Sequence, residues 1–195
     1  MGNANLPMSS TAPGGDGKAR TLVGTVMPAI RLKATDGTTV LLNDPGLTVV
    51  YAYPRTSPSD GQPLDGWDEI PGARGCTPQS CAFRDHFAEL RKLGVQRLFG
   101  VSTQTTEYQQ EAVDRLHLPF PLLSDSAHAL LSALQLPSFE AAGVTLLKRL
   151  TMIIEAGHIV HVFYPVPLPE RNADDVIAWL SARQKTATTF PENRR

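Results

Sequence analysis

The stretch GCTPQSC, residues 75–81, holds the only two cysteines of the 195-residue chain, five positions apart. Thr77 as N-cap and Pro78 as the first helical residue predict a helix start here. Apolar residues then recur at helical spacing up to a stop at Gly94, namely Phe83, Phe87, Leu90 and Leu93. A cysteine at a helix N-terminus ionises more easily, and a second thiol nearby can capture its oxidised form. The stretch therefore predicts thiol redox chemistry.

The elements on the N-terminal side of this helix predict a buried strand and a long loop. Residues 48–53 (TVVYAY) form a buried-strand pattern that ends at Pro54, and Leu41-Leu42 opens the domain. A polar loop rich in proline and glycine then occupies residues 55–75. Loops of this length inside compact domains are uncommon and often functional, so its place directly before Cys76 suggests a role at the site.

On the C-terminal side, helices and strands alternate and predict the fold class. The sequence predicts a strand at 97–101, a helix at 106–116, a short strand at 122–123, a helix at 126–134, a hairpin of strands 150–154 and 159–163 around Ala156-Gly157, and a final helix at 173–182. This order predicts one α/β three-layer domain with a central mixed β-sheet over residues 21–182. We expect residues 1–20 to form a disordered tail and residues 183–195 a flexible one.

The composition narrows the functional classes. An apolar fraction of 42% and a charged fraction of 19% are typical of a soluble globular protein. The net charge of −1 argues against nucleic acid or an anionic membrane as the main partner. No apolar run approaches the ~20 residues of a membrane span, and no secretory apolar region stands at the start. We expect a cytoplasmic protein, in which a bonded cysteine pair is more often catalytic than structural.

Helix geometry limits how the two thiols can bond. Residues five apart in a regular helix have Cα atoms ~8 to 9 Å apart, from the rise and the rotation per residue. A disulfide needs less than ~7 Å, so a bond between two helical cysteines requires the first turn to unwind. Because the residue before a proline disfavours the helical region, Pro78 allows Cys76 to lie just ahead of the helix. In either case, oxidation is coupled to local unfolding of residues 76–81.

Several of these residues also have interpretations that involve no redox chemistry. A free cysteine is most often a buried, inert side chain, and Cys76, Cys81 and His86 could begin a zinc site that lacks a fourth ligand. His86 is otherwise an ordinary helix-surface residue. Trp67 is expected simply to pack within its loop. The functional interpretation instead places it over the Cys76 pocket or makes it a docking contact. Ser124-Asp125 is expected to cap the following helix.

Several motifs together resemble the peroxiredoxin Q, or bacterioferritin-comigratory, branch of the peroxiredoxins: YAYP at 51–54, GCT at 75–77, Cys81, Arg84-Asp85, GVS at 100–102, PLLSD at 121–125, Arg149, Gly157 and Trp179-Leu180. The resemblance covers about residues 22–182. It implies a thioredoxin-like fold and reduction of hydrogen peroxide and alkyl hydroperoxides without a metal or organic cofactor. It also implies thioredoxin or glutaredoxin as reductant and a monomer or weak dimer.

The same resemblance assigns the catalytic roles. Cys76 matches the peroxidatic cysteine, Cys81 the resolving cysteine that forms an intramolecular disulfide with it, and Arg149 the arginine that reaches the thiolate. A guanidinium stays protonated and donates fixed hydrogen bonds, so it can stabilise charge as it moves from sulfur to oxygen. Without the resemblance, Arg149 would be read as a solvated residue at a strand end.

One position departs from the family pattern. The family has Thr or Ser three residues before the peroxidatic cysteine, and this chain has Ala73. The replacement hydroxyl could come from Thr56, Ser57, Ser59 or Thr77, or backbone donors alone could serve.

Two rival functions remain on the same fold. A thiol–disulfide oxidoreductase would act on protein disulfides, although the Cys-x-x-Cys spacing typical of that chemistry is absent. A redox sensor would instead use the cysteine pair to switch a partner surface, with the loop 55–75 as contact.

Overall fold

The computed structural model describes residues 21–57, 67, 70 and 73–189. Its main sheet is mixed, with seven strands in the order β2-β1-β5-β4-β3-β8-β9. These strands are β1 (Arg31–Ala34), β2 (Thr39–Leu41), β3 (Leu47–Ala52), β4 (Arg97–Ser102), β5 (Leu122–Ser124), β8 (Leu150–Glu155) and β9 (His158–Phe163). The central strands β3, β4 and β5 pair in parallel, and β8 pairs antiparallel with β3. The predicted α/β class with a mixed sheet is confirmed.

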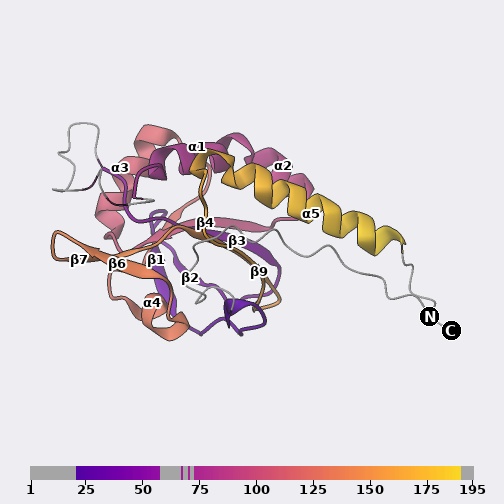
Figure 1. Cartoon of the computed structure of the whole chain (residues 1–195), viewed down its shortest axis with the longest axis horizontal. Coiled ribbons are helices and arrows are strands. Elements are labelled where there is room, and N and C mark those ends of the chain that lie inside the picture. Colours follow the sequence, from indigo (N-terminus) through magenta and orange to yellow (C-terminus); the bar gives the residue numbers. More distant parts are fainter. Residues whose placement is uncertain (1–20, 58–66, 68–69, 71–72, 190–195) are drawn as a thin grey trace.

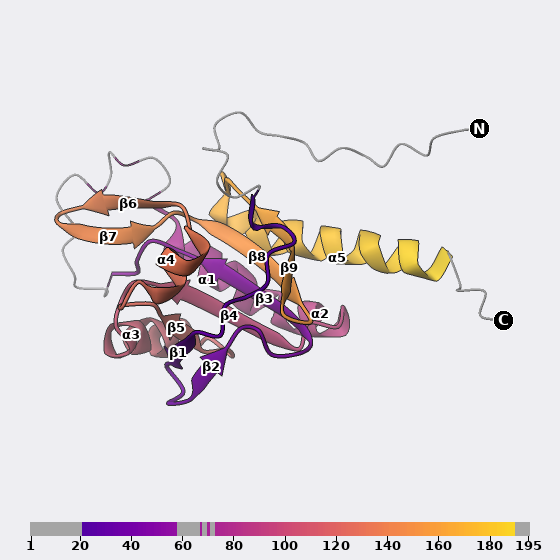
Figure 2. The same ribbon diagram turned by 90° about the horizontal axis from the view of Figure 1, so that it is seen from below.

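Helices cover both faces of this sheet and make three layers (Figure 1). The helices are α1 (Cys76–Asp85), α2 (Phe87–Lys92), α3 (Thr106–Leu116), α4 (Ala129–Leu134) and α5 (Asn172–Thr189), with a 3-10 turn η3 (Pro169–Arg171) before α5. Apolar residues of α1, α2, α3 and α5 pack on one face of the sheet, and those of α4 pack on the other. A separate hairpin of β6 (Ser138–Ala141) and β7 (Val144–Leu147) lies beside the sheet (Figure 2).

Strand β3 shows why both faces need cover. Its residues are buried from Thr48 onward. Because successive side chains point to opposite faces, Val49 and Tyr51 join the cluster under α1, while Val50 and Ala52 join the cluster under α4. This strand therefore anchors the core, and its C-terminal end points at the cysteine segment.

The helix that carries the cysteines begins earlier than predicted. The N-cap is Gly75, with φ of 101°, and Cys76 is the first helical residue, so the prediction of Thr77 as N-cap and Cys76 ahead of the helix is wrong. Pro78 is tolerated in the first turn because the N–H groups there have no intrahelical acceptor. The left-handed φ of Gly75 starts the helix two residues before the expected position.

Three further helix boundaries differ from the predictions. Helix α4 begins at Ala129 and not at residue 126. The single helix expected up to Leu93 is divided at His86 into α1 and α2. Helix α5 continues to Thr189, beyond the predicted end at 182, so part of the expected flexible tail 183–195 is helical. Arg183 pairs with Glu155 and Gln184 donates to the Leu93 carbonyl, and these contacts extend the helix. The expected tail at residues 1–20 lies outside the described residues.

The hairpins β6–β7 and β8–β9 both turn at an Ala-Gly pair. The predicted turn at Ala156-Gly157 is confirmed, with φ of 47° and 78°. The hairpin of β6 and β7, which was not predicted, turns at Ala142-Gly143 with φ of 48° and 74°. Positive φ at both central residues is the pattern of a type I′ turn, which matches the twist of the flanking strands.

Among the described residues, no helix is both long enough and apolar enough to cross a membrane.

Candidate active site

Three chain segments meet at the C-terminal end of β3. The β3–β8 register pairs Ala52 with Leu150, which places Arg149 beside the end of β3. Helix α1 packs over the same end, with Cys76 as its first residue. Cys76 and Arg149, which are 73 residues apart in the sequence, therefore lie in contact at this end of the sheet.

The sulfur of Cys76 lies in a small set of polar contacts. Arg149 Nη2 donates to Cys76 Sγ at 3.3 Å, and the same nitrogen donates to the Arg74 carbonyl at 2.9 Å. The thiol can donate to the Ala73 carbonyl at 3.6 Å. A guanidinium keeps its positive charge and donates fixed hydrogen bonds, so Arg149 presents a charged donor to the sulfur of Cys76.

Both site residues are withdrawn from solvent. Cys76 is 5% exposed and Arg149 is 5% exposed. The interpretation of Arg149 as a solvated strand-end residue is therefore wrong. Charge–dipole interactions strengthen where water is excluded, so the contact between this cation and the sulfur counts for more than it would at the surface.

Residues that the sequence reasoning missed extend the contacts of Arg149 inward. Arg149 Nη1 donates to Gln79 Oε1, and Gln79 Nε2 donates to Asn172 Oδ1 at 2.9 Å. Thr151 Oγ1 donates to the same Asn172 oxygen at 2.6 Å. Gln79 follows Cys76 by three positions, which places both on one helix face, and this spacing is a signal that could have identified it.

Cys81 lies in the same helix, about one and a half turns further along. It is half-buried against the apolar cluster under α1, and both cysteines are free thiols. Because both are helical, their Cα atoms are separated by ~8 to 9 Å on ideal geometry. A bond between them would require the first turn of α1 to open.

Two tyrosines form the floor beneath α1. Tyr51 donates to Ser80 Oγ at 3.0 Å and stacks on Phe83 with ring centroids 4.6 Å apart. Burial raises the pKa of Tyr51 well above its ordinary value, and the neighbouring Tyr53 adds to the shift. Burial also raises the pKa of Tyr53. Both phenols therefore stay neutral and place no negative charge under the sulfur.

Apolar packing occupies the position where the family pattern has a hydroxyl. Ala73 is fully buried and packs with Trp67, Ala141 and Leu146 beside the β6–β7 hairpin. Trp67 thus packs within its loop and against this hairpin, as the simpler of the two sequence interpretations expected. Ala73 therefore meets Cys76 through its backbone carbonyl, which can accept from the thiol.

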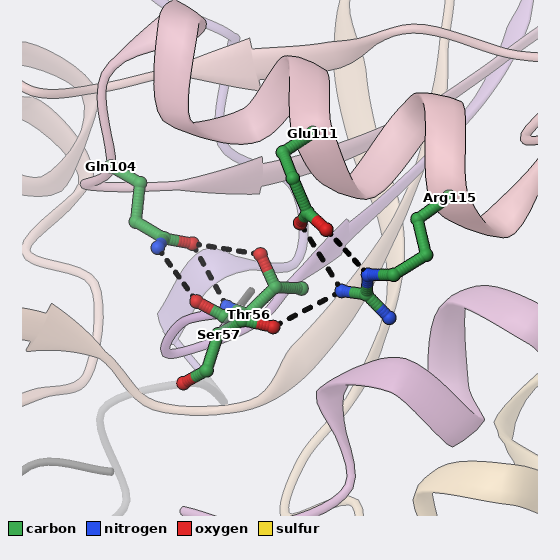
Figure 3. Close-up of polar contacts among 5 residues, drawn as sticks. All are labelled: Thr56, Ser57, Gln104, Glu111 and Arg115. Carbon is green, nitrogen blue, oxygen red and sulfur yellow. Dashed lines mark hydrogen bonds and ion pairs between the residues drawn. The ribbon is translucent and has the colours of Figure 1, made fainter. Parts of the chain in front are cut away.

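The first candidate for a replacement hydroxyl is engaged elsewhere (Figure 3). The Gln104 side chain accepts from the Thr56 backbone N–H at 2.9 Å and donates to the Thr56 carbonyl at 2.9 Å. The Thr56 hydroxyl faces the same amide oxygen at 3.4 Å. Arg115, paired with Glu111, donates to the Ser57 carbonyl at 3.1 Å. These contacts hold the start of the loop 55–75 against Gln104 and helix α3. The candidate Ser59 lies outside the described residues.

The other polar residues singled out in the sequence make contacts that hold helices in place. His86 lies between Glu89 and Asp174, at 3.3 and 3.2 Å, with its side chain 35% exposed. Arg84 bonds to Asp85 and to the Leu116 carbonyl, so it ties α1 to the end of α3. Asp125 accepts from the first N–H groups of α4, as predicted for a cap.

The zinc alternative gains no support. Within the described parts of the chain, no three His, Cys, Asp or Glu side chains gather closely enough to hold a metal ion.

Comparison with known sequences identifies relatives over most of the chain. The family model described as Redoxin matches residues 22–177. The chain is 30% identical over 167 residues to the chloroplastic peroxiredoxin Q of Sedum lineare, a match that covers 84% of this chain and 80% of the relative. It is 33% identical over 139 residues to peroxiredoxin bcp1 of Schizosaccharomyces pombe, covering 69% of this chain and 61% of the relative.

Solved structures show the same fold. The peroxidoxin BcpB of Mycobacterium tuberculosis superposes with a TM-score of 0.65 at 22% identity, covering 82% of this chain and 96% of that chain. Peroxiredoxin Q of Xanthomonas campestris gives a TM-score of 0.64 at 24% identity, covering 82% of this chain and 97% of that chain. These matches confirm the thioredoxin-like architecture expected from the sequence.

Proposed function

The chain belongs to the redoxin family, in the peroxiredoxin Q branch, and is a thiol peroxidase, and from that premise we propose that Cys76 is its peroxidatic residue, Cys81 its resolving residue and Arg149 the cation that assists Cys76. The contact between Arg149 Nη2 and Cys76 Sγ at 3.3 Å carries the proposal. It joins a buried, always-charged donor to a helix-N-terminal thiol, which is the arrangement that a sulfur nucleophile needs.

In the first step, the Cys76 thiolate attacks the terminal oxygen of the hydroperoxide. The S–O bond forms as the O–O bond breaks, and the leaving oxygen takes a proton to give water or an alcohol. Sulfur is oxidised to a sulfenic acid, and the peroxide is reduced. Arg149 serves here because its hydrogen bonds can follow the negative charge from sulfur to the departing oxygen.

In the second step, the Cys81 thiol condenses with the Cys76 sulfenic acid. A disulfide forms and one water leaves. The first turn of α1 opens to let the two sulfurs meet, because both cysteines are helical in the reduced protein. A dithiol then reduces the disulfide by exchange, and we propose thioredoxin or glutaredoxin for that role.

Substitution of the cysteines tests both assignments. Cys76→Ser is expected to abolish peroxide consumption, because Cys76 is the thiol to which Arg149 donates and a serine hydroxyl is a far weaker nucleophile than a thiol. Cys81→Ser is expected to consume one equivalent of peroxide and then stop, as followed by peroxide assay and intact mass. Normal thioredoxin-supported cycling by Cys81→Ser would refute the resolving role.

Substitution of Arg149 tests the cation. We expect Arg149→Met to slow Cys76 oxidation about 100-fold or more, the usual cost of removing a donor from a charged transition state. Arg97→Met is the matched control, since Arg97 also makes several bonds, to Thr48, Leu41 and Asp44. Arg97 lies at the N-terminal end of β4, which is the end of the sheet away from Cys76. Stopped-flow fluorescence gives both rates, and equal rates for Arg149→Met and wild type would remove Arg149 from the mechanism.

The same instrument separates peroxidase from the rival functions. Fast stoichiometric oxidation by hydrogen peroxide followed by sustained thioredoxin-linked turnover is the expected result. Fast oxidation without turnover would indicate a redox sensor, and sluggish oxidation a thiol–disulfide exchange enzyme.

Assembly and compartment remain predictions from the sequence. We propose a monomer or weak dimer, which size-exclusion chromatography with light scattering would test. The cytoplasmic location is likewise proposed. The Sedum relative is named as chloroplastic, and fractionation of the source cells decides between compartments.

A further inference from the structure

Arg149 is held by a chain of buried amides as well as by the site itself. The chain runs from Arg149 Nη1 to Gln79 Oε1, and from Gln79 Nε2 to Asn172 Oδ1. Gln79 and Asn172 are fully buried, as is Thr151, which also donates to Asn172. The guanidinium at Cys76 is thereby connected to the first residue of α5, the last helix of the fold.

Hydrogen-bond direction makes the members of this chain interdependent. An arginine can only donate, so Gln79 must present its oxygen to Arg149. The amide nitrogen of Gln79 then faces Asn172 and needs an acceptor, because a buried donor without one costs about 1–3 kcal/mol. Asn172 Oδ1 is that acceptor, and it therefore fixes which end of the Gln79 amide meets Arg149.

Burial of the Asn172 side chain costs free energy of folding, because half of its amide is unsatisfied. Its Nδ2 is buried with no hydrogen-bond partner among the described residues, while its Oδ1 accepts two bonds. An apolar residue would avoid the penalty of the unpaired nitrogen. The useful part of the side chain is thus its oxygen, and that oxygen faces Gln79.

The junction of η3 and α5 contacts α1 at two points around Cys76. Pro169 lies so close to Gly75 that a Cβ on Gly75 would come within 2.6 Å of its ring. Asn172 bonds to Gln79 one turn further along α1. These contacts bracket the helical turn that carries the sulfur.

We propose that Asn172 is a positioning residue for peroxide reduction, which acts through Gln79 to hold Arg149 against Cys76. The inference rests on the proposed role of Cys76 as nucleophile and adds a residue 96 positions away in the sequence, on another element. Asn172 touches neither the sulfur nor the peroxide. Its contribution is to fix the orientation of the Gln79 amide and, with it, the guanidinium.

A double-mutant cycle tests the route of action. In the Cys81→Ser background, which leaves one thiol, we compare Asn172→Ala, Gln79→Leu and the two combined. The second-order rate of Cys76 oxidation by hydrogen peroxide should fall about tenfold in each single variant, less than for loss of Arg149 itself. If Asn172 acts through Gln79, the combined variant should be no slower than Gln79→Leu alone.

Gln109→Leu is the matched control. Gln109 is also a fully buried glutamine whose amide makes two hydrogen bonds, to Ser102 and the Leu123 carbonyl, but it has no bond to Arg149. It should lose stability to urea as Gln79→Leu does while its oxidation rate stays within about threefold of the parent. An equal fall in rate for both glutamine variants would show a general packing effect and overturn the proposal.

Two further outcomes are decisive. Multiplying effects in the combined variant would show that Asn172 acts independently of Gln79, and unchanged oxidation in Asn172→Ala would show no role at all. Where Asn172→Ala does not fold, Asn172→Ser replaces it with the same expectation, since serine suits a helix start but is too short to reach Gln79.

A readout without peroxide keeps this inference separate from the proposed function. In the Cys81→Ser background, the rate at which iodoacetamide alkylates Cys76 should fall in Asn172→Ala and Gln79→Leu but not in Gln109→Leu, because this reaction also depends on the contact between Arg149 and the sulfur. If the parent reacts with no peroxide, the proposed function fails, while the alkylation rate still reports whether Asn172 positions Arg149.

Discussion

Gly75 shows how one residue sets the position of the Cys76 sulfur. It is the N-cap of α1 with φ of 101°, a conformation that only glycine adopts without strain. It also leaves room for Pro169, since an added Cβ would lie 2.6 Å from the proline ring. The residue before Cys76 therefore meets a backbone demand and a packing demand together.

Gly75→Ala separates these two demands when it is compared with Gly37→Ala. Gly37 also has a positive φ, 82°, but no atom within 4 Å of the added Cβ. Gly37→Ala should lose about 1–2 kcal/mol in urea denaturation, the cost of the left-handed region. Gly75→Ala should lose more and should also oxidise more slowly, because Pro169 must move. Equal losses would mean that the Pro169 contact contributes nothing.

The active site was only partly predictable from its residues. The cysteine spacing and the position of Arg149 are visible in the sequence, and the structure places Arg149 on Cys76. Gln79 is marked in the sequence only by its spacing of three from Cys76. Asn172 has no signal at all, because its bond to Gln79 joins positions 93 residues apart and buried amides carry no periodic pattern. The burial of Arg149 was missed for the same reason, since exposure of a strand-end residue depends on what packs over it.

At the scale of elements, the sequence predicted helices and strands correctly where the local residue preferences agree with the packing in the fold. Helix α3 has the predicted bounds 106–116, and Thr105 caps it through a bond to the Tyr108 N–H. The short strands β1, β6 and β7 were missed, because a run of four residues is too short for alternation to be recognised, even in β1, where exposed and buried residues do alternate. The break between α1 and α2 was also missed, because apolar spacing continues across His86.

His161 gives a pH-dependent contact between β9 and α5. Its ring stacks on Trp179 with centroids 4.7 Å apart and meets the edge of Phe163 at 4.6 Å. Burial lowers the pKa of His161 below its ordinary value. The imidazole in the folded protein is therefore held neutral at a pH where the unfolded chain already binds a proton.

The stability of the fold should consequently fall in mild acid. Above the ordinary histidine pKa of about 6.5 neither state binds the proton, so His161 adds no pH dependence. As pH drops below that value the unfolded state binds it first, and stability falls until pH passes the lowered pKa of the folded protein. Urea denaturation at pH 7.5 and 5.0 should show a smaller difference for His161→Phe than for wild type. His117→Asn, at an exposed site, should keep the wild-type difference.

At the scale of the whole molecule, oxidation should loosen one region and spare the sheet. Formation of the proposed disulfide opens the first turn of α1 and breaks its contacts with Arg149, Pro169 and Asn172. Hydrogen exchange should therefore accelerate in residues 75–85 and in η3, while β3, β4 and β8 keep their protection. Peroxide-treated Cys81→Ser, which cannot form the bond, should retain slow exchange. Uniform acceleration across the sheet would contradict a local change.

The stability of the protein could be raised by substitution at the two Ala-Gly hairpin turns. Ala142 and Ala156 each hold a left-handed φ that asparagine tolerates far better than alanine. Replacing both with asparagine should recover about 1 kcal/mol at each turn, which for a domain of this size raises the melting temperature by roughly 2–4 °C per replacement. Neither turn contacts Cys76, so both substitutions should leave the rate of Cys76 oxidation unchanged. Calorimetry would measure the rise in melting temperature. The natural chain evidently meets its stability requirement without optimising these turns.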